Sequence, residues 1–383
     1  MASVIVATLG ASLCLCGFRM FRAKEPSNTD GKSDITIVMV GDILLHEPIE
    51  EAAKDVNGKY NYDFIFAGMK KEISVADIAI VNQEVIIGGE ELGVSGYPSF
   101  NAAYEAGDAL VGTGFDVICH GTNHALDKGK SGVVNCVNYW KEHHPEITVV
   151  GINGSEEEYK NITIVDKKGV RIAVLNYTYD TNGIPQPSDM PHAIDMMDKD
   201  KVIADLQYAE ENADFTIVCP HWGTEYRLTP DSYQEYWTGV FRKYGADLVI
   251  GTHPHVIEPV VMFEDESTGI TNNHGGGDML VYYSLGNFVS WTSSSGRGIA
   301  NRSVGGMATV TIGIDTDEVV VKNFGVRALV CHLQEGPKGA VVYPLSEYSD
   351  SLGEINAIKA QDTSFSRQYC VDLCNKVWGN GWK

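Results

Sequence analysis

Two histidines separated by a single proline, His253 and His255, follow the apolar run "ADLVI" within the stretch "GTHPHVIEP". In an extended chain, residues two positions apart point the same way. The two imidazoles would then converge on one point, which suggests a metal ion. A single histidine at a strand end is more often a hydrogen-bonded loop residue, so the pair needs partners elsewhere in the chain.

Further polar residues occupy similar positions, at or just past the carboxyl ends of other apolar runs. They are Asp42, Asn82, Glu84, Asn123, His124, His221 and Asn287. In an open α/β sheet this edge is where ligands bind. A mixture of Asp, Glu, Asn and His suits divalent Mn, Zn or Fe, and two such ions can activate a water and hold a phosphoryl-like centre. We therefore predict a site for two divalent metal ions, formed by Asp42, Glu84, Asn123, His221, His253 and His255.

Each of these residues also has a plainer interpretation. Asp42 follows Gly41, which would let the chain turn sharply and expose the carboxylate, but an Asp can simply close a turn. His46 could join Asp42 or cap the next helix. Glu84 could bridge two cations or be a solvated loop acid, and Asn82 could orient a ligand or bond to the turn. The prediction therefore depends on the set and not on one member.

The stretch "TNHALDKG" adds a candidate for proton transfer. Beside the ligand Asn123, His124 could act as a proton donor. Asp127 lies three residues further on, where it could orient that imidazole or cap the following turn. We predict His124 and Asp127 as the catalytic pair.

The elements that must position these residues are short runs rich in Val and Ile, such as "DITIVMVGD", "ADIAIVNQE" and "DFTIVCPHWG". The runs are apolar without alternation, which indicates strands buried on both faces. The amphipathic stretches 202–213 and 232–246 between them indicate helices, and residues 161–179 indicate a hairpin. The segments after residue 306 indicate more β structure, so the fold class is α/β with an antiparallel portion.

Six stretches in order also carry a family resemblance: "GD" at 41–42, "NQE" at 82–84, "TNHALDKG" at 122–129, "HWGTEY" at 221–226, "GTHPHV" at 251–256 and "YSLGNFV" at 283–289. Over roughly residues 34–330 the chain resembles the poly-γ-glutamate capsule synthesis protein (CapA) family. That family is similar to calcineurin-like metallophosphoesterases, whose signature runs Asp, Asp, Asn-His, His, then Gly-His-x-His. The resemblance implies a four-layer α/β/β/α sandwich of metallophosphoesterase type with a dinuclear metal centre. On this resemblance His124 is the proton-donating histidine, and the matching ligands are Asp42, Asn123, His221, His253 and His255.

The sequence departs from these patterns in four places. Phosphoesterases usually have Asp-x-His in the first motif, and here "GDILLH" leaves His46 out of register. Their bridging Asp after Gly has no counterpart, and Glu84 is our substitute. Gln83 and Thr122 stand where the capsule family usually has Leu and Asn. The other predicted ligands are retained.

The formal net charge of −22 argues against nucleic-acid binding through a broad basic face. The partner implied by the resemblance, an anionic polymer such as poly-γ-glutamate, is acidic too, so its binding needs the metal ions or local cations. Arg227, Arg297 and Arg302 are candidates, and each has the alternative of being a solvated surface arginine. The glycine- and serine-rich loop 292–306 could cover the site. We also assign Asn287 to substrate binding.

The ends of the chain raise questions of location. Residues 2–18 carry no charge, as in a signal peptide or membrane anchor, which we extend to 1–24 and follow with a linker at 25–33. The basic residues follow the apolar segment, which conflicts with simple export. We expect a membrane-anchored or secreted protein with the domain (34–330) outside the cell, and a C-terminal extension at 331–383. Cys370 and Cys374 could form a disulfide or stay free thiols.

Two functions of different class remain open. The first is metal-dependent hydrolysis of a phosphoester or an amide-like bond. The second is a non-catalytic, membrane-anchored assembly or binding component that works with other capsule synthesis proteins at the membrane. Retention of His124 favours the first, because binding alone needs no proton donor.

Overall fold

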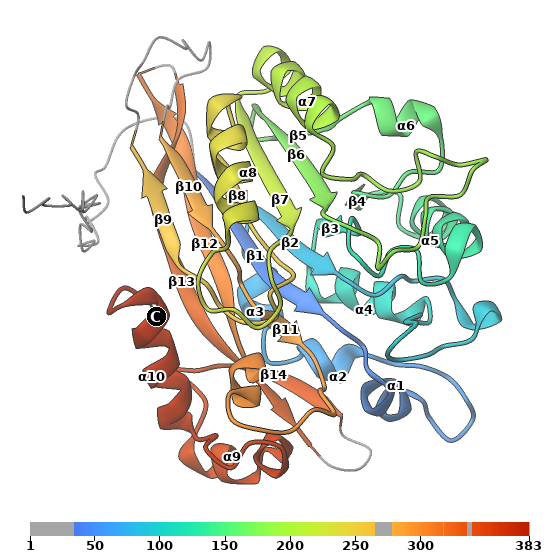
Figure 1. Ribbon diagram of the computed structural model, residues 1–383, viewed down its shortest axis with the longest axis vertical. Coiled ribbons are helices and arrows are strands. Elements are labelled where there is room, and N and C mark those ends of the chain that lie inside the picture. The colour runs from blue at the N-terminus through green and yellow to red at the C-terminus, as the bar shows by residue number, and fades with distance from the viewer. Residues whose placement is uncertain (1–33, 265–277, 317, 335–338, 383) are drawn as a thin grey trace, which may run out of the picture.

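Two β-sheets lie face to face in the computed structural model, which describes residues 34–264, 278–316, 318–334 and 339–382 (Figure 1). The first sheet has eight strands. In spatial order these are β14 (Ala340–Pro344), β13 (Glu318–Leu333), β12 (Val304–Asp315), β1 (Ile35–Ile43), β2 (Ile78–Gln83), β3 (Val117–Cys119) and β4 (Thr148–Val150), with β11 (Asn287–Val289) paired to β1. β1 to β4 run parallel, and β12 to β14 continue the sheet antiparallel.

The second sheet has six strands. Their spatial order is β5 (Thr163–Lys167), β6 (Val170–Thr178), β7 (Phe215–His221), β8 (Leu248–Ile250), β10 (Met279–Tyr282) and β9 (Val260–Phe263). β6, β7, β8 and β10 are parallel, and the hairpin predicted at 161–179 is confirmed as β5 and β6. Parallel strands bring their carboxyl ends to one edge, which is where the polar residues collect.

The central strands are buried on both faces, as their unbroken apolar composition predicts. In β1, Ile37 and Met39 join the core between the two sheets, whereas Val38 and Val40 join the core beneath the helices. Each strand therefore needs apolar residues at successive positions, not alternate ones.

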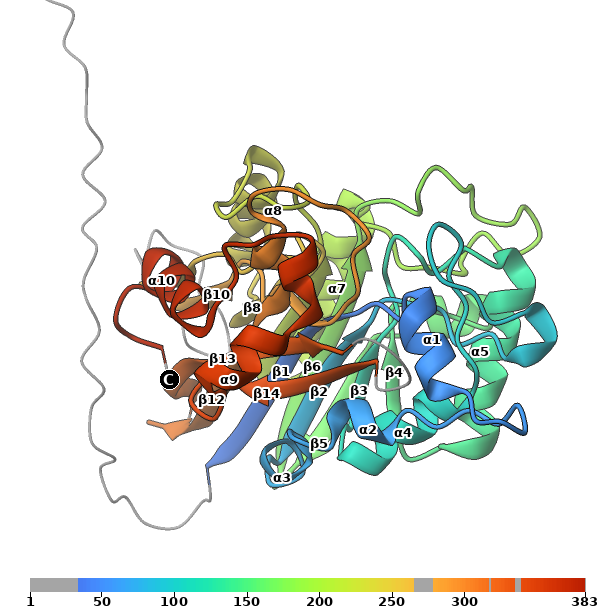
Figure 2. The same ribbon diagram turned by 90° about the horizontal axis from the view of Figure 1, so that it is seen from below.

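Helices cover the outer face of each sheet, so the molecule has four layers, α/β/β/α, and the predicted fold class is confirmed (Figure 2). On the first sheet lie α1 (Glu47–Ala53), α2 (Asp63–Phe66), α3 (Lys70–Ile73), α4 (Glu105–Thr113) and α5 (Gly129–His143), with η1 (Glu90–Leu92) nearby in the chain. On the second lie α7 (Lys199–Asn212) and α8 (Ser232–Lys243), close to the predicted ranges. The short α6 (Glu156–Lys160) precedes β5.

The C-terminal segment is part of the same fold. β13 runs across residue 330, where we placed the start of an extension, and β14 pairs with its second half. After β14 come α9 (Asp350–Ile355), η3 (Ala357–Ala360) and α10 (Arg367–Trp378), and buried residues of η3 and α10 join the core on the helical side of the first sheet. Cys370 and Cys374 are buried free thiols on α10, so the disulfide alternative is not realised.

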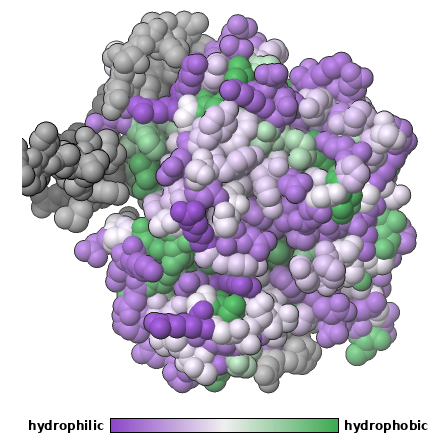
Figure 3. Space-filling view, viewed as in Figure 1, coloured by the Kyte–Doolittle hydropathy of each residue, from purple (hydrophilic) through white to green (hydrophobic). Residues whose placement is uncertain are grey.

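The predicted anchor (1–24) and linker (25–33) lie outside the described residues. Within the described part of the chain, no helix has the length and apolarity needed to cross a membrane. The face shown in Figure 3 is mostly hydrophilic, with apolar residues in small scattered groups.

Candidate metal centre

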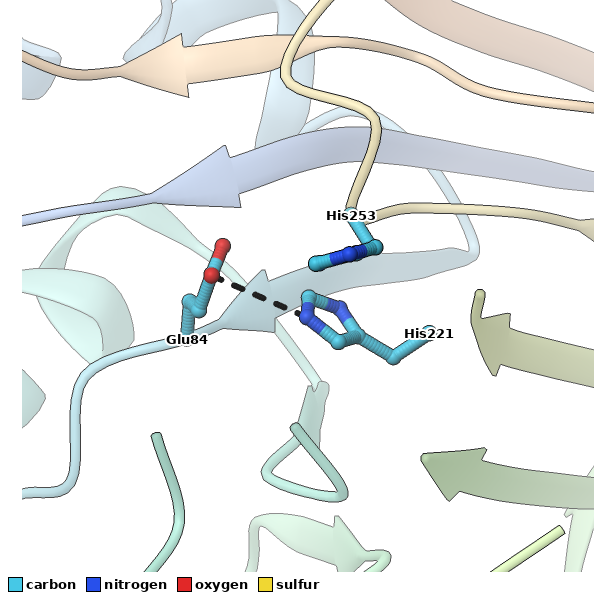
Figure 4. Close-up of side chains that lie close together, drawn as sticks. All are labelled: Glu84, His221 and His253. Carbon is cyan, nitrogen blue, oxygen red and sulfur yellow. Dashed lines mark ion pairs between the residues drawn. The ribbon is translucent and has the colours of Figure 1, made fainter. Parts of the chain in front are cut away.

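The polar residues predicted at the strand ends come together where the two sheets meet. Asp42 lies on β1, Glu84 directly follows β2, and His221 ends β7. Figure 4 shows Glu84, His221 and His253 facing one another, with His221 Nε2 3.6 Å from Glu84 Oε1. Both of these side chains are fully buried. Segments far apart in sequence therefore place an acid and two imidazoles at one point.

Three groups of side chains among the described residues have ligand atoms close enough to hold a metal ion. They are Glu84 with His221 and His253, Asp42 with Glu84 and His255, and Glu225 with His253 and His255. Within each group, ligand atoms lie within 4.8 Å of one another. Glu84 belongs to two groups, which is the position that a bridging carboxylate needs.

Asp42 is held inside the site by several donors. Its Oδ1 accepts from Asn82 Nδ2 at 2.9 Å, and both its oxygens lie 3.2 Å from the backbone N–H of His253. The sharp exposing turn expected after Gly41 is absent, because β1 continues to Ile43 and Asp42 is fully buried. Gly41 has a different role: a Cβ there would lie 1.8 Å from the carbonyl oxygen of Gly286, so glycine permits that close approach.

His221 is oriented through both ring nitrogens. Its Nδ1 lies 3.1 Å from Thr252 Oγ1, and its Nε2 lies 2.9 Å from Asn123 Oδ1. These contacts fix the orientation of the ring. Asn123 thus lies beside His221, a member of the cluster, and its role as a metal ligand stays a prediction.

His253 and His255 converge for a different reason from the one expected. β8 ends at Ile250, and both histidines have left-handed backbones, with φ of 96° and 58°. The extended geometry assumed from the sequence is therefore wrong. The turn still brings the rings together, with centroids 5.6 Å apart. Non-glycine residues in this region are strained, and such strain is concentrated at functional sites.

The residues present fit a metal centre. Glu84 is fully buried, yet neither of its oxygens has a hydrogen-bond partner, and the same holds for Asn82 Oδ1 and His253 Nδ1. Burying polar atoms without partners is costly, and a cation would supply the missing interactions. The set of carboxylate, amide and imidazole donors suits divalent Mn, Zn or Fe.

Burial also sets the protonation of this cluster. It raises the pKa of the Glu84 carboxyl well above its usual range, and it lowers the pKa of His221 and His253 well below theirs. Burial acts in the same way on His255, but the charges of Glu84 and Asp42 raise its pKa to about 9. Neutral imidazoles are the form that binds metals, so His221 and His253 are ready ligands.

The predicted catalytic pair lies directly beside the cluster. His124 Nδ1 is 2.7 Å from Asp127 Oδ2, so Asp127 orients the imidazole, the first of the two roles considered for it. Asn182 connects the pair to the metal centre, since its Oδ1 accepts from Asn123 Nδ2 at 3.2 Å and its Nδ2 lies 3.3 Å from His124 Nδ1.

Asn287 and His46 lie near the centre in supporting positions. Asn287 is buried, its Oδ1 lies 3.1 Å from His255 Nδ1, and its amide group donates to the carbonyls of His255 and Arg302. These contacts place Asn287 against His255, and its contact with substrate stays a prediction. His46 is the N-cap residue of α1 and its Nδ1 accepts from the Trp291 N–H, and burial lowers its pKa to about 4. His46 is in none of the three ligand groups.

The three predicted arginines differ in their relation to the centre. Arg302 stacks 3.4 Å above the ring of Tyr226, and that ring lies 6.0 Å from His255. Arg227 is exposed and donates to Thr229 Oγ1, and Arg297 is exposed. Only Arg302 is tied to the metal cluster by contacts among the described residues.

The loop 292–306 is held in place, although we expected a flexible cover. It contains η2 (Ile299–Ser303) and the start of β12. Asp362 accepts the N–H groups of Gly298 and Ala300, and Gln361 donates to the carbonyl of Thr292. The C-terminal segment therefore anchors this loop.

Glu225 is the site residue that our reading of the sequence missed. Its carboxylate is close enough to His253 and His255 to share an ion with them, and unlike them it is exposed. The next residue, Tyr226, has a φ of 65° and donates its N–H to the carbonyl of Pro254, which ties this loop to the histidine turn. Both residues lie in the stretch "HWGTEY", in which we predicted only His221 as a ligand.

Comparison with known proteins agrees with the motifs. Capsule biosynthesis protein CapA of Bacillus anthracis is 27% identical over 272 residues, 67% of this chain and 61% of that protein. PGA biosynthesis protein CapA of Bacillus subtilis (strain 168) is 29% identical over 182 residues, 46% of this chain and 44% of that protein. The matched region is thus less than two thirds of the length of either relative.

Solved structures with a similar arrangement are more distant. A putative 5'-nucleotidase from Staphylococcus aureus, in complex with alpha-ketoglutarate, is 15% identical, with a TM-score of 0.44 over 89% of this chain and 58% of that one. The calcineurin-like phosphoesterase YfkN from Bacillus subtilis is 13% identical, with a TM-score of 0.40 over 89% of this chain and all of that one.

The model of the family described as bacterial capsule synthesis protein PGA_cap matches residues 36–292. This range includes all six predicted ligands and both members of the His124–Asp127 pair. Since the match extends over more than half of the sequence, the chain belongs to the bacterial capsule synthesis protein family PGA_cap.

Proposed function

We propose that this protein is a metal-dependent hydrolase that acts in the synthesis, transport or processing of an anionic polymer such as poly-γ-glutamate. The process is suggested by the family and by the names of the two relatives. The observation that carries the hydrolase proposal is the His124–Asp127 pair beside the ligand cluster. A site that only binds carboxylates needs no oriented proton donor.

The ions proposed are two divalent cations of Mn, Zn or Fe, held by Asp42, Glu84, Asn123, His221, His253 and His255. When bound, such ions activate a water and polarise the bond that it attacks. The scissile bond is a phosphoester or an amide-like bond, both of which develop negative charge during hydrolysis.

The residues of the chain supply the proton. With Nδ1 of His124 directed at Asp127, the opposite nitrogen, Nε2, can give a proton to the leaving group. A positioned general acid contributes roughly 10²-fold or more to the rate. Asp127 acts through His124 and is therefore a positioning residue.

A second candidate is a membrane-anchored component of the polymer machinery that holds the polymer without cleaving it, together with other capsule synthesis proteins. The observation in its favour is that both relatives are named for biosynthesis and neither for cleavage. In this case the metal centre and Arg302 would hold carboxylates.

The test begins with elemental analysis of protein purified without chelator. Activity is then screened with added Mn²⁺ against phosphodiesters and γ-glutamyl polymers. His124→Ala should keep its metal and lose roughly 10²-fold or more of the turnover. His143→Ala, an exposed histidine on α5, is the matched control and should keep both. A metal-loaded parent without activity on either substrate class favours the assembly component.

We further propose that the domain lies outside the cell, carried by the apolar segment at residues 2–18. Protease added to intact cells should then degrade the domain, while a cytoplasmic marker survives. Protection of the domain until the cells are lysed would contradict this location.

A further inference from the structure

A cavity of about 640 Å³ opens between the edge of the first sheet and the second sheet. It is lined by parts of β4, α5, α6 and β6, and this volume is typical of small-molecule sites. Its apolar wall includes Val137, Ile147, Val149 and Ile162. None of the six predicted metal ligands lines it.

One lysine of the cavity is already committed to protein partners. Lys201 Nζ donates to Asp205 Oδ2 and to the carbonyl of Tyr159, both at 2.8 Å, and lies 4.3 Å from the centre of the Tyr159 ring. The other lysine, Lys141, is paired with Glu158. Because both ammonium groups already have acidic partners in the protein, they are poorly suited to binding an anionic ligand.

Asp195 has an oxygen without a matching donor. Its Oδ2 accepts from Asn153 Nδ2 at 3.2 Å, whereas its buried Oδ1 makes no hydrogen bond to any described residue. Lys201 Nζ forms an ion pair with this oxygen at 3.6 Å, beyond hydrogen-bond distance, and two of its three N–H groups are donated to Tyr159 and Asp205. A buried carboxylate oxygen left in this state is costly unless a ligand or water donates to it.

The net charge of the lining indicates which charge the ligand carries. Four acids (Glu157, Glu158, Asp195 and Asp205) face two bases (Lys141 and Lys201), so the lining carries a formal charge of −2. We propose that this cavity binds a small organic amine. The ammonium group donates to Asp195 Oδ1, and the carbon chain packs against Val149 and Ile162.

The cavity lies directly behind the metal centre. Asn176 is part of its wall and accepts from the Gly121 N–H at 2.6 Å, while its Nδ2 donates to the carbonyl of Cys219 at 2.7 Å. Gly121 and Cys219 each stand two residues before a predicted ligand, Asn123 or His221. Asn176 thus connects the cavity wall to the two segments that carry Asn123 and His221, and the amine site stands whether or not the protein is a hydrolase.

The test uses the full chain in the presence of a chelator, so that no amine binds through a metal ion. Binding of n-butylamine, n-butanol and butyrate at pH 7.5 is measured by saturation-transfer NMR with titration. Butylamine should bind saturably and more tightly than the other two. Asp195→Asn should weaken butylamine binding about tenfold or more, since a hydrogen bond to a charged group is lost. Glu156→Gln removes a charge from α6 outside the cavity lining and should leave the affinity unchanged.

Val149→Trp is a second, independent test of the proposal, because the larger side chain fills the cavity and leaves Asp195 unchanged. It should abolish butylamine binding, and its thermal unfolding shows whether the fold survives, as for Asp195→Asn. The proposal is overturned by equal binding of butyrate or butanol, by unchanged affinity in a folded Asp195→Asn or Val149→Trp variant, or by an absence of amine binding to the parent protein.

Discussion

Asp127 Oδ2 lies 2.7 Å from His124 Nδ1 and also 2.7 Å from the backbone nitrogen of Phe100, which donates to it. The ring of Phe100 in turn packs edge-on against His124, with centroids 4.7 Å apart. The imidazole is thus fixed by a carboxylate that is itself fixed by the backbone. This arrangement orients the proposed proton donor beside the candidate metal ligands.

Asp127→Asn should lower turnover by roughly tenfold to a hundredfold, because the amide no longer accepts the His124 N–H with a full charge. Metal content should not change. Steady-state kinetics and elemental analysis measure the two quantities. Parent-like rates in a metal-loaded variant would remove Asp127 from any role in proton transfer.

The paired substitution His253→Ala with His255→Ala should remove most of the metal. We expect about two divalent ions per chain in the parent, since a dinuclear centre is the predicted use of six ligands. Elemental analysis of both proteins gives the answer, with His143→Ala as the control. A double variant with the parent's metal content would show that the ions, if any, bind elsewhere.

Glu84 and Glu225 should differ in their effect on metal affinity. Glu84 is buried and shared by two ligand groups, whereas Glu225 is exposed and belongs to one. We expect Glu84→Gln to weaken Mn²⁺ binding by about a hundredfold and Glu225→Gln by about tenfold or less. Calorimetric titration of the metal-free protein compares them, with the exposed Glu235→Gln as control. A larger loss for Glu225→Gln would reverse the ranking.

Much of the fold could be predicted from the sequence because the interactions that determine it are local in the chain. β1 and β7 are apolar at successive positions, which only burial on both faces explains, and α8 begins with a capping box between Asp231 and Gln234. Parallel strands then force the side chains at their carboxyl ends together. That is why the sequence alone could predict that Asp42, Glu84 and His221 lie in one site.

The remainder depends on tertiary contacts that no local pattern encodes. The left-handed turns at His253 and His255 are imposed by the surrounding loops, so an extended chain was the wrong default. Glu225 enters the site because Tyr226 bonds to Pro254. Asn287 lies beside His255 because β11 pairs with β1 in a register that sets Asn287 opposite Asp42.

Stability should depend on pH through Glu258. This carboxyl is fully buried, and burial raises its pKa to about 8, although Gln234 donates to it at 2.6 Å. The folded state thus keeps a proton that the unfolded state releases above its ordinary pKa. Stability contributed by this group is present below about pH 4.5 and is lost as the pH rises to about 8.

Glu258→Gln keeps the shape and the acceptor for Gln234 but cannot ionise. Its free energy of unfolding should therefore fall less than that of the parent between pH 5 and 8, by on the order of 1 kcal/mol or more. Urea unfolding at several pH values measures the difference. Glu235→Gln, at an exposed position in the first turn of α8, should follow the parent. Parallel pH profiles for parent and Glu258→Gln would mean that the carboxyl ionises freely in the folded state.

The last prediction concerns how an acidic protein binds an acidic polymer. With a formal net charge of −22, long-range electrostatics oppose binding, so local cations and the metal centre must overcome them. Arginine pairs bidentately with carboxylates, and the Arg302 guanidinium, stacked on Tyr226 beside His255, is held near the metal cluster.

Arg302→Ala should therefore weaken binding of γ-glutamyl oligomers by about tenfold, roughly the value of one charge-assisted hydrogen bond. Arg297→Ala should change it little, because no contact ties Arg297 to the cluster in the part of the chain that the structure describes. Chelator and added salt should each weaken binding in the parent protein. Oligomer binding that persists with chelator in Arg302→Ala would place the polymer on another surface.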